Sequence, residues 1–238
     1  MTTPLKTLGL IGGMSGESTL PYYRRINETV KAELGGLHSA RIILYSVDFA
    51  DIEHLQASGQ WQAAGTLLAD VAQKLEGAGA DALVLCTNTM HKVAEAITEA
   101  VDIPLLHIAD PTARAIRQAG YSTVGLLGTN FTMEQDFYRN RLEQGHGLTV
   151  LTPPKADRDR VHQIIYQELC LGQVRDASRQ AYLRVIADLG ARGAQAIILG
   201  CTEIAMLIQP ENCPLPVFDT TALHARSAAL WALSAPGP

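Results

Sequence analysis

Several common sequence features are missing from this chain, and each absence excludes a class of protein. The four cysteines lie far apart in the 238 residues, with no C-x-x-C pair, which argues against a zinc site or a thioredoxin-type redox centre. No apolar run approaches the roughly 20 residues of a membrane helix. The apolar stretch near the N-terminus is too short and too glycine-broken for a secretory signal. We therefore expect a cytoplasmic protein with free thiols and no membrane partner.

Signatures of nucleic-acid and cofactor binding are missing as well. The net charge is −5 and no run of Lys and Arg is long enough for a nucleic-acid patch, so a small-molecule partner is expected. The early glycines Gly9, Gly12, Gly13 and Gly16 do not follow G-x-G-x-x-G, and no Walker lysine accompanies them. Lysines are few, and none lies in a phosphate-binding turn. We expect no cofactor and no metal, with a nucleotide-dependent oxidoreductase kept as a rival because Asp48 could imitate a ribose-binding acid.

What the chain does contain is a regular alternation of short β-rich runs and amphipathic segments. This order predicts an α/β fold with parallel sheets, and the charged, proline-marked segment Pro153–Arg160 is interpreted as a solvated loop. The predicted strands are 7–12, 41–47, 81–86, 103–108, 122–127, 148–151, 196–199 and 215–218, and the predicted helices are 21–31, 61–76, 93–101, 111–119, 134–143, 161–171, 177–189, 203–208 and 222–233.

The two halves of the sequence resemble each other locally. The segment Thr7–Gly12 matches Thr123–Gly128 at an offset of 116 residues (7 to 123), and Gly79–Leu83 matches Gly193–Ile197 at an offset of 114 (79 to 193). We predict two similar doubly wound lobes related by a pseudo-twofold axis. Their expected extents are 1–110 plus 215–238 for the first lobe and 111–214 for the second. Ligands of such sheets bind at the carboxyl ends of the strands, which predicts an active site in the crevice between the lobes.

Two polar strand ends carry the chemistry. Leu83–His91 and Ile197–Glu203 each run from an apolar strand into hydroxyl, thiol and amide groups. The offset of 114 pairs Cys201 with Thr87, and it pairs the neighbouring Cys86 with Gly200 (200 to 86). Because neighbouring strand residues face opposite ways, Thr87 is expected to share the orientation of Cys201 while Cys86 points away.

These segments carry a family resemblance that covers almost the whole chain. Gly12-Gly13-Met14, Thr87-Asn88-Thr89 with His91, and Gly200-Cys201-Thr202-Glu203 together resemble the aspartate/glutamate/hydantoin racemase family of cofactor-independent amino-acid racemases. The resemblance implies a two-base mechanism, in which one residue removes the α-proton and another returns a proton to the opposite face. Thiols suit this role because nearby donors and helix N-termini can draw their pKa toward neutrality. The resemblance also implies a homodimer.

The sequence departs from the family at the first base. Most members have cysteine where Thr87 stands, and a threonine hydroxyl is a much weaker acid than a thiol. The chain thus resembles a branch with Thr in place of the first catalytic Cys. The resemblance implies that Cys201 deprotonates L-isomers. We expect Thr87 to reprotonate the other face slowly, so that the L-isomer is the favoured substrate. Cys86 remains a possible alternative to Thr87 as the first base.

Residues at the strand ends and the loops after them are expected to hold the substrate. Local matching places Ile52 and Cys170 where aspartate-specific relatives have Arg and Lys, so glutamate, homoserine or a broader range stay open beside aspartate. A one-cysteine decarboxylase or cis–trans isomerase of small diacids, and a non-catalytic binding protein, are the alternative functions. The predicted substrate-binding residues are Met14, Gln56, Thr87, Asn88, Thr89, Thr129 and Thr202.

Overall fold

The computed structural model describes residues 5–235, which form two compact units. One unit contains the described residues up to His107 and those from His224 onward, and the other is Ile108–Leu223. The chain returns to the first unit at His224, later than the expected boundary at 214/215. The reason is that the last strand pairs within the second sheet. None of the helices described is both long and apolar enough to cross a membrane. The expected crevice and pseudo-twofold axis stay predictions.

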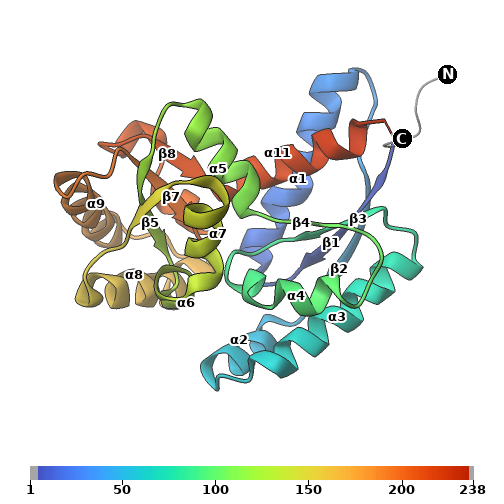
Figure 1. The fold of residues 1–238 in the computed structure, drawn as a ribbon, viewed down its shortest axis with the longest axis horizontal. Helices are drawn as coiled ribbons and strands as arrows, with labels where there is room; N and C mark the ends of the chain where they lie inside the picture. The colour runs from blue at the N-terminus through green and yellow to red at the C-terminus, as the bar shows by residue number, and fades with distance from the viewer. Residues whose placement is uncertain (1–4, 236–238) are drawn as a thin grey trace. The chain divides into compact units, whose positions relative to one another are not determined.

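The first unit is built on a four-stranded parallel sheet with strand order β2-β1-β3-β4 (Figure 1). Its central strands are apolar and buried on both faces, as parallel strands covered by helices usually are. The strands are β1 (Thr7–Gly12), β2 (Arg41–Ser46), β3 (Ala82–Leu85) and β4 (Leu105–Leu106), and the helices are α1 (Gly16–Leu34), α2 (Phe49–Ala57), α3 (Trp61–Gly77), the 3-10 helix η1 (Thr89–Val93), α4 (Ala94–Thr98) and the later part of α11 (Thr220–Leu233).

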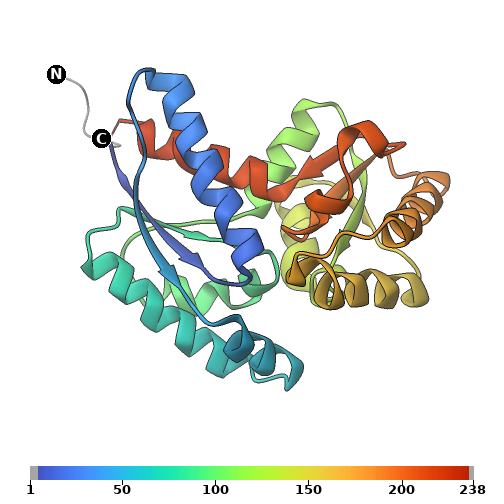
Figure 2. The ribbon, with the colours of Figure 1, turned by 180° about the vertical axis from the view of Figure 1, so that it is seen from behind.

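The two faces of this sheet support two separate cores. Leu83 and Leu85 of β3 pack with Leu68 and Leu75 of α3 on one face. Alternate β3 residues pack on the other face with α1 and α11, which lie together in the view from behind (Figure 2). This alternation of side chains is the two-residue period of a strand. It places successive residues at the end of β3 in different surroundings.

The second unit repeats the plan, with strand order β6-β5-β7-β8 and parallel pairing throughout. One continuous hydrophobic core joins its helices to the sheet. The strands are β5 (Thr123–Gly128), β6 (Thr149–Leu151), β7 (Ala196–Gly200) and β8 (Val217–Asp219), and the helical segments are α5 (Ala109–Gln118), α6 (Asn130–Glu134), α7 (Asp136–His146), α8 (Lys155–Gln167), η2 (Leu169–Leu171), α9 (Asp176–Ala191), α10 (Ile204–Leu207) and η3 (Pro210–Asn212).

The pairing register of the two sheets confirms the repeat seen in the sequence. Ile11 lies opposite Leu85 in the first sheet, and Leu127 lies opposite Leu199 in the second. These are the partners that the offsets of 116 and 114 residues predict. The predicted α/β fold with two parallel-sheet lobes is therefore confirmed, and the strand ends after β3 and β7 occupy the same topological position.

The charged segment Pro153–Arg160 was expected to be a loop, and this expectation is wrong. Helix α8 begins at Lys155, directly after the extended residue Pro154. The lysine pairs with Asp159 four residues later, with 2.7 Å between Nζ and Oδ2, and Asp157 lies in the first turn. An i,i+4 pair and an acidic first turn both favour a helix start. Helix α2 lies in a segment for which the sequence predicted neither a strand nor a helix, and Asp48 is its N-cap.

Candidate functional site

The strand end after β7 carries a thiol held close to a buried carboxylate. Cys201 follows the last residue of β7 and is 9% exposed, while Glu203 is 3% exposed. The strand ends in Gly200 because two backbones approach closely there. A Cβ added to Gly200 would lie 2.8 Å from the carbonyl oxygen of Leu127. The glycine therefore lets β7 reach β5 in register and delivers Cys201 to the sheet edge.

The Glu203 carboxylate accepts hydrogen bonds from three neighbouring side chains. The Cys201 thiol donates to Oε2 over 2.9 Å, and the Thr202 hydroxyl donates to the same oxygen over 2.6 Å. The Cys170 thiol donates to Oε1 over 3.5 Å. Hydrogen bonds to a charged acceptor are stronger than those between neutral groups. Glu203 is thus surrounded by two thiols and a hydroxyl, all directed at its carboxyl oxygens.

The pKa of Cys201 is raised well above its ordinary value, first by burial and then by the charge of Glu203. Sequence analysis expected the opposite, because donors and a helix start were to draw the thiol pKa toward neutrality. The following helix α10 has only four residues, and the nearest charged group is an anion. A buried thiol beside a carboxylate keeps its proton, because both surroundings disfavour a second negative charge.

Cys170, which sequence analysis placed where aspartate-specific relatives have a lysine, belongs to this cluster. It lies in η2, and burial raises its pKa, with a further contribution from Glu203. Tyr182 of α9 is fully buried next to the cluster, and its hydroxyl donates to the carbonyl of Val161 over 3.1 Å. Burial also raises the pKa of Tyr182. Both groups remain protonated in neutral solution.

The strand end after β3 separates two neighbouring residues into different surroundings. Cys86 is fully buried in the core shared by α1 and α11, and burial raises its pKa. Thr87 is 8% exposed and uses its backbone in two hydrogen bonds. Its N–H donates to the Leu85 carbonyl over 2.9 Å, and its own carbonyl accepts from His91 Nδ1 over 2.8 Å. The sulfur therefore packs inside the unit, as the strand alternation predicted.

Three histidines of the first unit lie close together, and one of them, His91, contacts Thr87. The rings of His91 and His107 lie 4.4 Å apart, and that of His224 lies 6.0 Å from His91. His224 Nε2 donates to the Leu106 carbonyl over 2.6 Å, so its Nδ1 accepts the hydroxyl of Tyr22 at 2.8 Å. The hydrogen bond from His91 to the Thr87 carbonyl fixes the turn that follows β3.

The other predicted substrate-binding residues of the first unit are buried near this turn or beside it. Met14 is 3% exposed and packs in the core under α3, and Gln56 lies in α2 rather than in a loop. The Gln56 amide donates to Met90 Sδ over 3.0 Å. Asn88 and Thr89, at the start of η1, are 2% and 6% exposed. Buried polar side chains in such a turn give a defined set of donors and acceptors.

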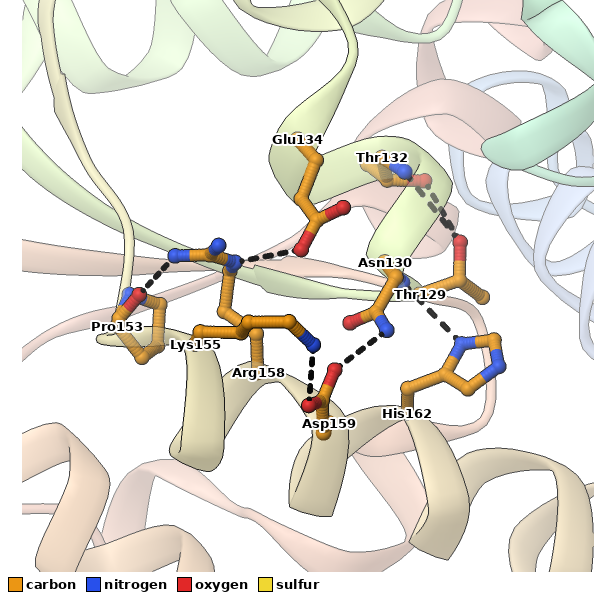
Figure 3. Close-up of polar contacts among 9 residues, drawn as sticks. All are labelled: Thr129, Asn130, Thr132, Glu134, Pro153, Lys155, Arg158, Asp159 and His162. Atoms are coloured by element: carbon orange, nitrogen blue, oxygen red, sulfur yellow. Dashed lines mark hydrogen bonds and ion pairs between the residues drawn. The ribbon is translucent and has the colours of Figure 1, made fainter.

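Thr129 of the second unit follows β5 and caps a short helix. Its hydroxyl accepts from the Thr132 N–H over 3.4 Å at the start of α6 (Figure 3). The next residue, Asn130, binds α8 twice. Its backbone N–H donates to His162 Nδ1 over 3.2 Å, and its side chain donates to Asp159 over 3.0 Å. These bonds hold the end of β5 against the charged start of α8.

His162 is half-buried in this group and was absent from the sequence candidates. Burial lowers its pKa below 6.5, and the charges of Asp159 and Glu134 oppose that shift. Neutral His162 can accept the Asn130 N–H at Nδ1, whereas the protonated ring cannot. His162, Glu203 and Cys170 are the polar groups that sequence reasoning missed. Of these only Glu203 had a signal, its place two residues after Cys201.

The cluster around Cys201 combines a thiol, a carboxylate and the Thr202 hydroxyl, whose proton is donated to Glu203. This set can exchange protons with a small substrate and can accept a hydrogen bond from an ammonium group. Within residues 5–235, no three His, Cys, Asp or Glu side chains come together as a metal-binding group.

Comparison with known proteins adds independent information. Residues 11–228 match the family described as Asp/Glu/Hydantoin racemase. The chain is 60% identical to a proposed Asp/Glu racemase from Yersinia pestis, with a TM-score of 0.89 and coverage of 97% of this chain and 100% of that one. It is 32% identical to an aspartate racemase homologue from Pyrococcus horikoshii OT3, with a TM-score of 0.82 and coverage of 97% and 100%. It is also 25% identical to the broad specificity amino-acid racemase RacX of Bacillus subtilis (strain 168), over 92% of this chain and 95% of RacX.

Proposed function

Because the chain belongs to the Asp/Glu/hydantoin racemase family of amino-acid racemases, we propose that it interconverts amino-acid enantiomers by two-base proton transfer. Cys201 removes the α-proton of L-isomers, and Thr87 returns a proton to the opposite face, directly or through water. The observation that carries this assignment is the Cys201 thiol held 2.9 Å from a buried carboxylate at the end of β7.

The two bases are unequal, and the proposed enzyme favours the L-isomer as substrate. A thiol is a far stronger acid than a hydroxyl, so Cys201 can serve as a base more readily than Thr87. Cys86 does not take over from Thr87 in this proposal. Its sulfur packs in the core with α1 and α11, away from the polar turn, and burial disfavours its thiolate. The chain would thus belong to a branch of the family with Thr in place of the first catalytic Cys.

We propose a substrate range broader than aspartate. Ile52 is fully buried in the first core, and Cys170 donates to Glu203, so neither supplies a cation for a side-chain carboxylate. Thr202 gives its proton to Glu203, which leaves its oxygen lone pairs to accept from a substrate ammonium. The similarity to the broad specificity racemase RacX supports this range. Met14, Gln56, Asn88, Thr89 and Thr129 complete the proposed substrate contacts.

A screen for α-deuterium incorporation tests the proposal. The protein is incubated in heavy water with each L-amino acid in turn, and the product is analysed by mass spectrometry and chiral chromatography. We expect incorporation together with formation of the D-isomer for at least one amino acid, and loss of both in Cys201→Ser. Incorporation unaffected by that substitution would contradict the role of Cys201. Carbon dioxide release or double-bond isomerisation of a small diacid, without incorporation, would favour a one-cysteine enzyme instead.

We further propose that the enzyme is a homodimer, as the family resemblance implies. Helix α1 presents Leu20 and Tyr23 with 70% and 55% of their surfaces exposed, and such neighbouring apolar side chains are typical of association surfaces. Light scattering over a concentration series would show twice the monomer mass. A monomer at micromolar concentration would contradict this part of the proposal without affecting the assigned reaction.

A further inference from the structure

The surroundings of Cys201 pose a chemical problem for any mechanism that uses its thiolate. The sulfur is buried, and the nearest charged group is the carboxylate of Glu203, 2.9 Å away. Releasing a proton to solvent would place two negative charges side by side in a region of low dielectric, which is strongly unfavourable. The thiolate can form there without this penalty only if the proton moves to a group that is itself negatively charged.

We propose that Glu203 is the positioning residue that receives the Cys201 proton, so that the thiol and the carboxylate share one proton and present the thiolate without releasing it to solvent. This inference rests on the proposed racemase function for its catalytic meaning. Three contacts carry it: the thiol donates to Oε2, the Thr202 hydroxyl donates to the same oxygen, and the Cys170 thiol donates to Oε1.

The proton transfer balances within the pair. The Sγ–H bond of Cys201 breaks while an O–H bond forms on Glu203 Oε2, which leaves one negative charge, now on sulfur. The thiolate then removes the α-proton of the L-isomer, and the charge passes to the substrate. Cys201 now holds the α-proton of the substrate, and Thr87 has given its own proton to the opposite face. Glu203 then releases the transferred proton to solvent while Thr87 regains one from solvent, and the carboxylate again accepts the hydrogen bond of the Cys201 thiol. No oxidant, reductant or metal takes part.

Cys170 and Thr202 set the balance between the two forms of the pair. Both donate to the carboxyl group, and these two hydrogen bonds weaken when Glu203 takes the proton. The titratable groups that face Cys201 are Glu203, Cys170 from η2 and Tyr182 from α9, with Glu168 near Tyr182. Cys170 and Tyr182 stay protonated, because burial raises the pKa of both. Glu203, whose carboxylate oxygen lies 2.9 Å from the Cys201 sulfur, is therefore the acceptor of the proton in this proposal.

A pH series of thiol alkylation tests the inference without depending on racemase activity. Iodoacetamide reacts with thiolates, and peptide mass spectrometry reports Cys201 and Cys213 in the same digest. Cys213 is half-buried with a raised pKa, and its hydrogen-bonding neighbour is the backbone of Leu215 rather than a carboxylate. It should react about tenfold faster per pH unit between about pH 7 and 9. We expect Cys201 to change less than about threefold over that range, because moving a shared proton within the pair is independent of pH.

Substitution of the carboxylate should remove this difference. In Glu203→Gln we expect Cys201 to acquire the slope of Cys213, and α-proton exchange from L-isomers to become about tenfold steeper per pH unit and slower at neutral pH. Glu203→Asp keeps an acid and should keep the flat profile. Glu168→Gln is the matched control, because Glu168 is also buried but accepts from Ser178 over 2.6 Å instead, and its profile should be that of the unmodified protein.

The outcomes separate this inference from the proposed function. A tenfold-per-unit slope for Cys201 in the unmodified protein overturns the proton sharing, whether or not any amino acid exchanges, and this result needs no variant to fold. A flat Cys201 profile combined with no exchange for any amino acid would support the proton sharing and overturn the racemase assignment.

Discussion

The strand ends after β3 and β7 have the same place in two sheets of the same strand order, yet they differ in chemistry. The end of β7 holds Cys201 against a carboxylate at 2.9 Å, whereas the hydrogen bonds of Thr87 at the end of β3 run through its backbone. A hydroxyl without an acid–base partner is a poor proton carrier. A repeated fold can therefore keep its register while its two strand ends place their polar side chains in different surroundings.

The residues one step earlier differ in the same way. Cys86 packs its side chain into the core with α1 and α11, whereas its counterpart Gly200 has no space for a side chain. Added atoms at Gly200 would lie 2.8 Å from Leu126 Cδ1 and from the Leu127 carbonyl oxygen. The first unit therefore packs the Cys86 sulfur in its core one residue before Thr87, whereas the second unit has no side chain at the matching position before Cys201.

The largest effect is expected when the two proposed bases are removed one at a time. Cys201→Ala should reduce α-proton exchange from L-isomers by about 100-fold or more, as expected for loss of a general base. Thr87→Ala should keep that exchange within a few-fold, because the first step does not use the hydroxyl, while D-isomer formation falls. Mass spectrometry and chiral chromatography measure the two quantities separately. Equal losses of exchange in both variants would show that the strand ends are equivalent.

The next effect is on stability and concerns Gly200, the residue without a side chain at the end of β7. Gly200→Ala should lower the free energy of unfolding by about 1–3 kcal/mol, because the new methyl group meets backbone atoms of β5. Gly145→Ala is the control in the same unit, since its Cβ would approach an Arg141 carbon at only 4.0 Å within α7. Urea denaturation gives both values. A neutral Gly200→Ala would mean that the close approach of β5 and β7 is not required.

A smaller effect is expected when the strand end after β3 is given a cysteine like that after β7. Thr87→Cys is expected to raise turnover of D-isomers by about tenfold or more, because a thiol replaces a much weaker acid at the first base. Chiral chromatography with pure D-substrate measures the rate. Cys86→Ala is the matched control and should retain racemisation, with a modest loss of stability from the core. Loss of racemisation in Cys86→Ala would instead make Cys86 the first base.

The smallest effect is a pH dependence confined to the second unit. The pKa of His162 lies below 6.5 in the fold, so the unfolded chain binds this proton at higher pH than the folded chain. Its contribution to stability is present above about pH 6.5 and is lost as pH falls toward the folded-state pKa. In His162→Gln the free energy of unfolding should fall less steeply with decreasing pH. The difference from the unmodified protein should be less than about 1 kcal/mol, because half of the ring is exposed to solvent. An unchanged slope in thermal melts at about pH 7.5 and 5.5 would contradict it.

Much of the fold could be predicted from the sequence because it depends on local period and repetition. The strands were found because parallel strands buried on both faces appear in the sequence as apolar runs. The offsets between the halves predicted that Leu127 and Leu199 take the places of Ile11 and Leu85, and each pair is in register in its own sheet. The start of α8 was missed for a physical reason. Its first turns carry charges whose partners, such as Glu134 for Arg158, lie elsewhere in the sequence.

The candidate site could be predicted in part. Strand alternation placed Cys86 away from the turn that holds Thr87, and the sequence pattern singled out Cys201. The predicted direction of the Cys201 pKa shift was wrong. The shift depends on the orientation of the Glu203 side chain and on burial by residues distant in the sequence, and neither leaves a periodic pattern in the sequence. The contact of Cys170 with Glu203 joins residues 33 positions apart and is visible only in three dimensions.

The hydrogen bond from Cys201 to Glu203 also bears on how this protein withstands oxidation. Peroxides attack sulfur mainly in its ionised form, and the first product is a sulfenic acid. A resting sulfur that keeps its proton beside an anion reacts slowly with them. The sulfur becomes nucleophilic only while its proton resides on the neighbouring oxygen. Storage in air without an added reducing agent should therefore leave Cys201 unmodified for longer than an exposed cysteine of ordinary acidity.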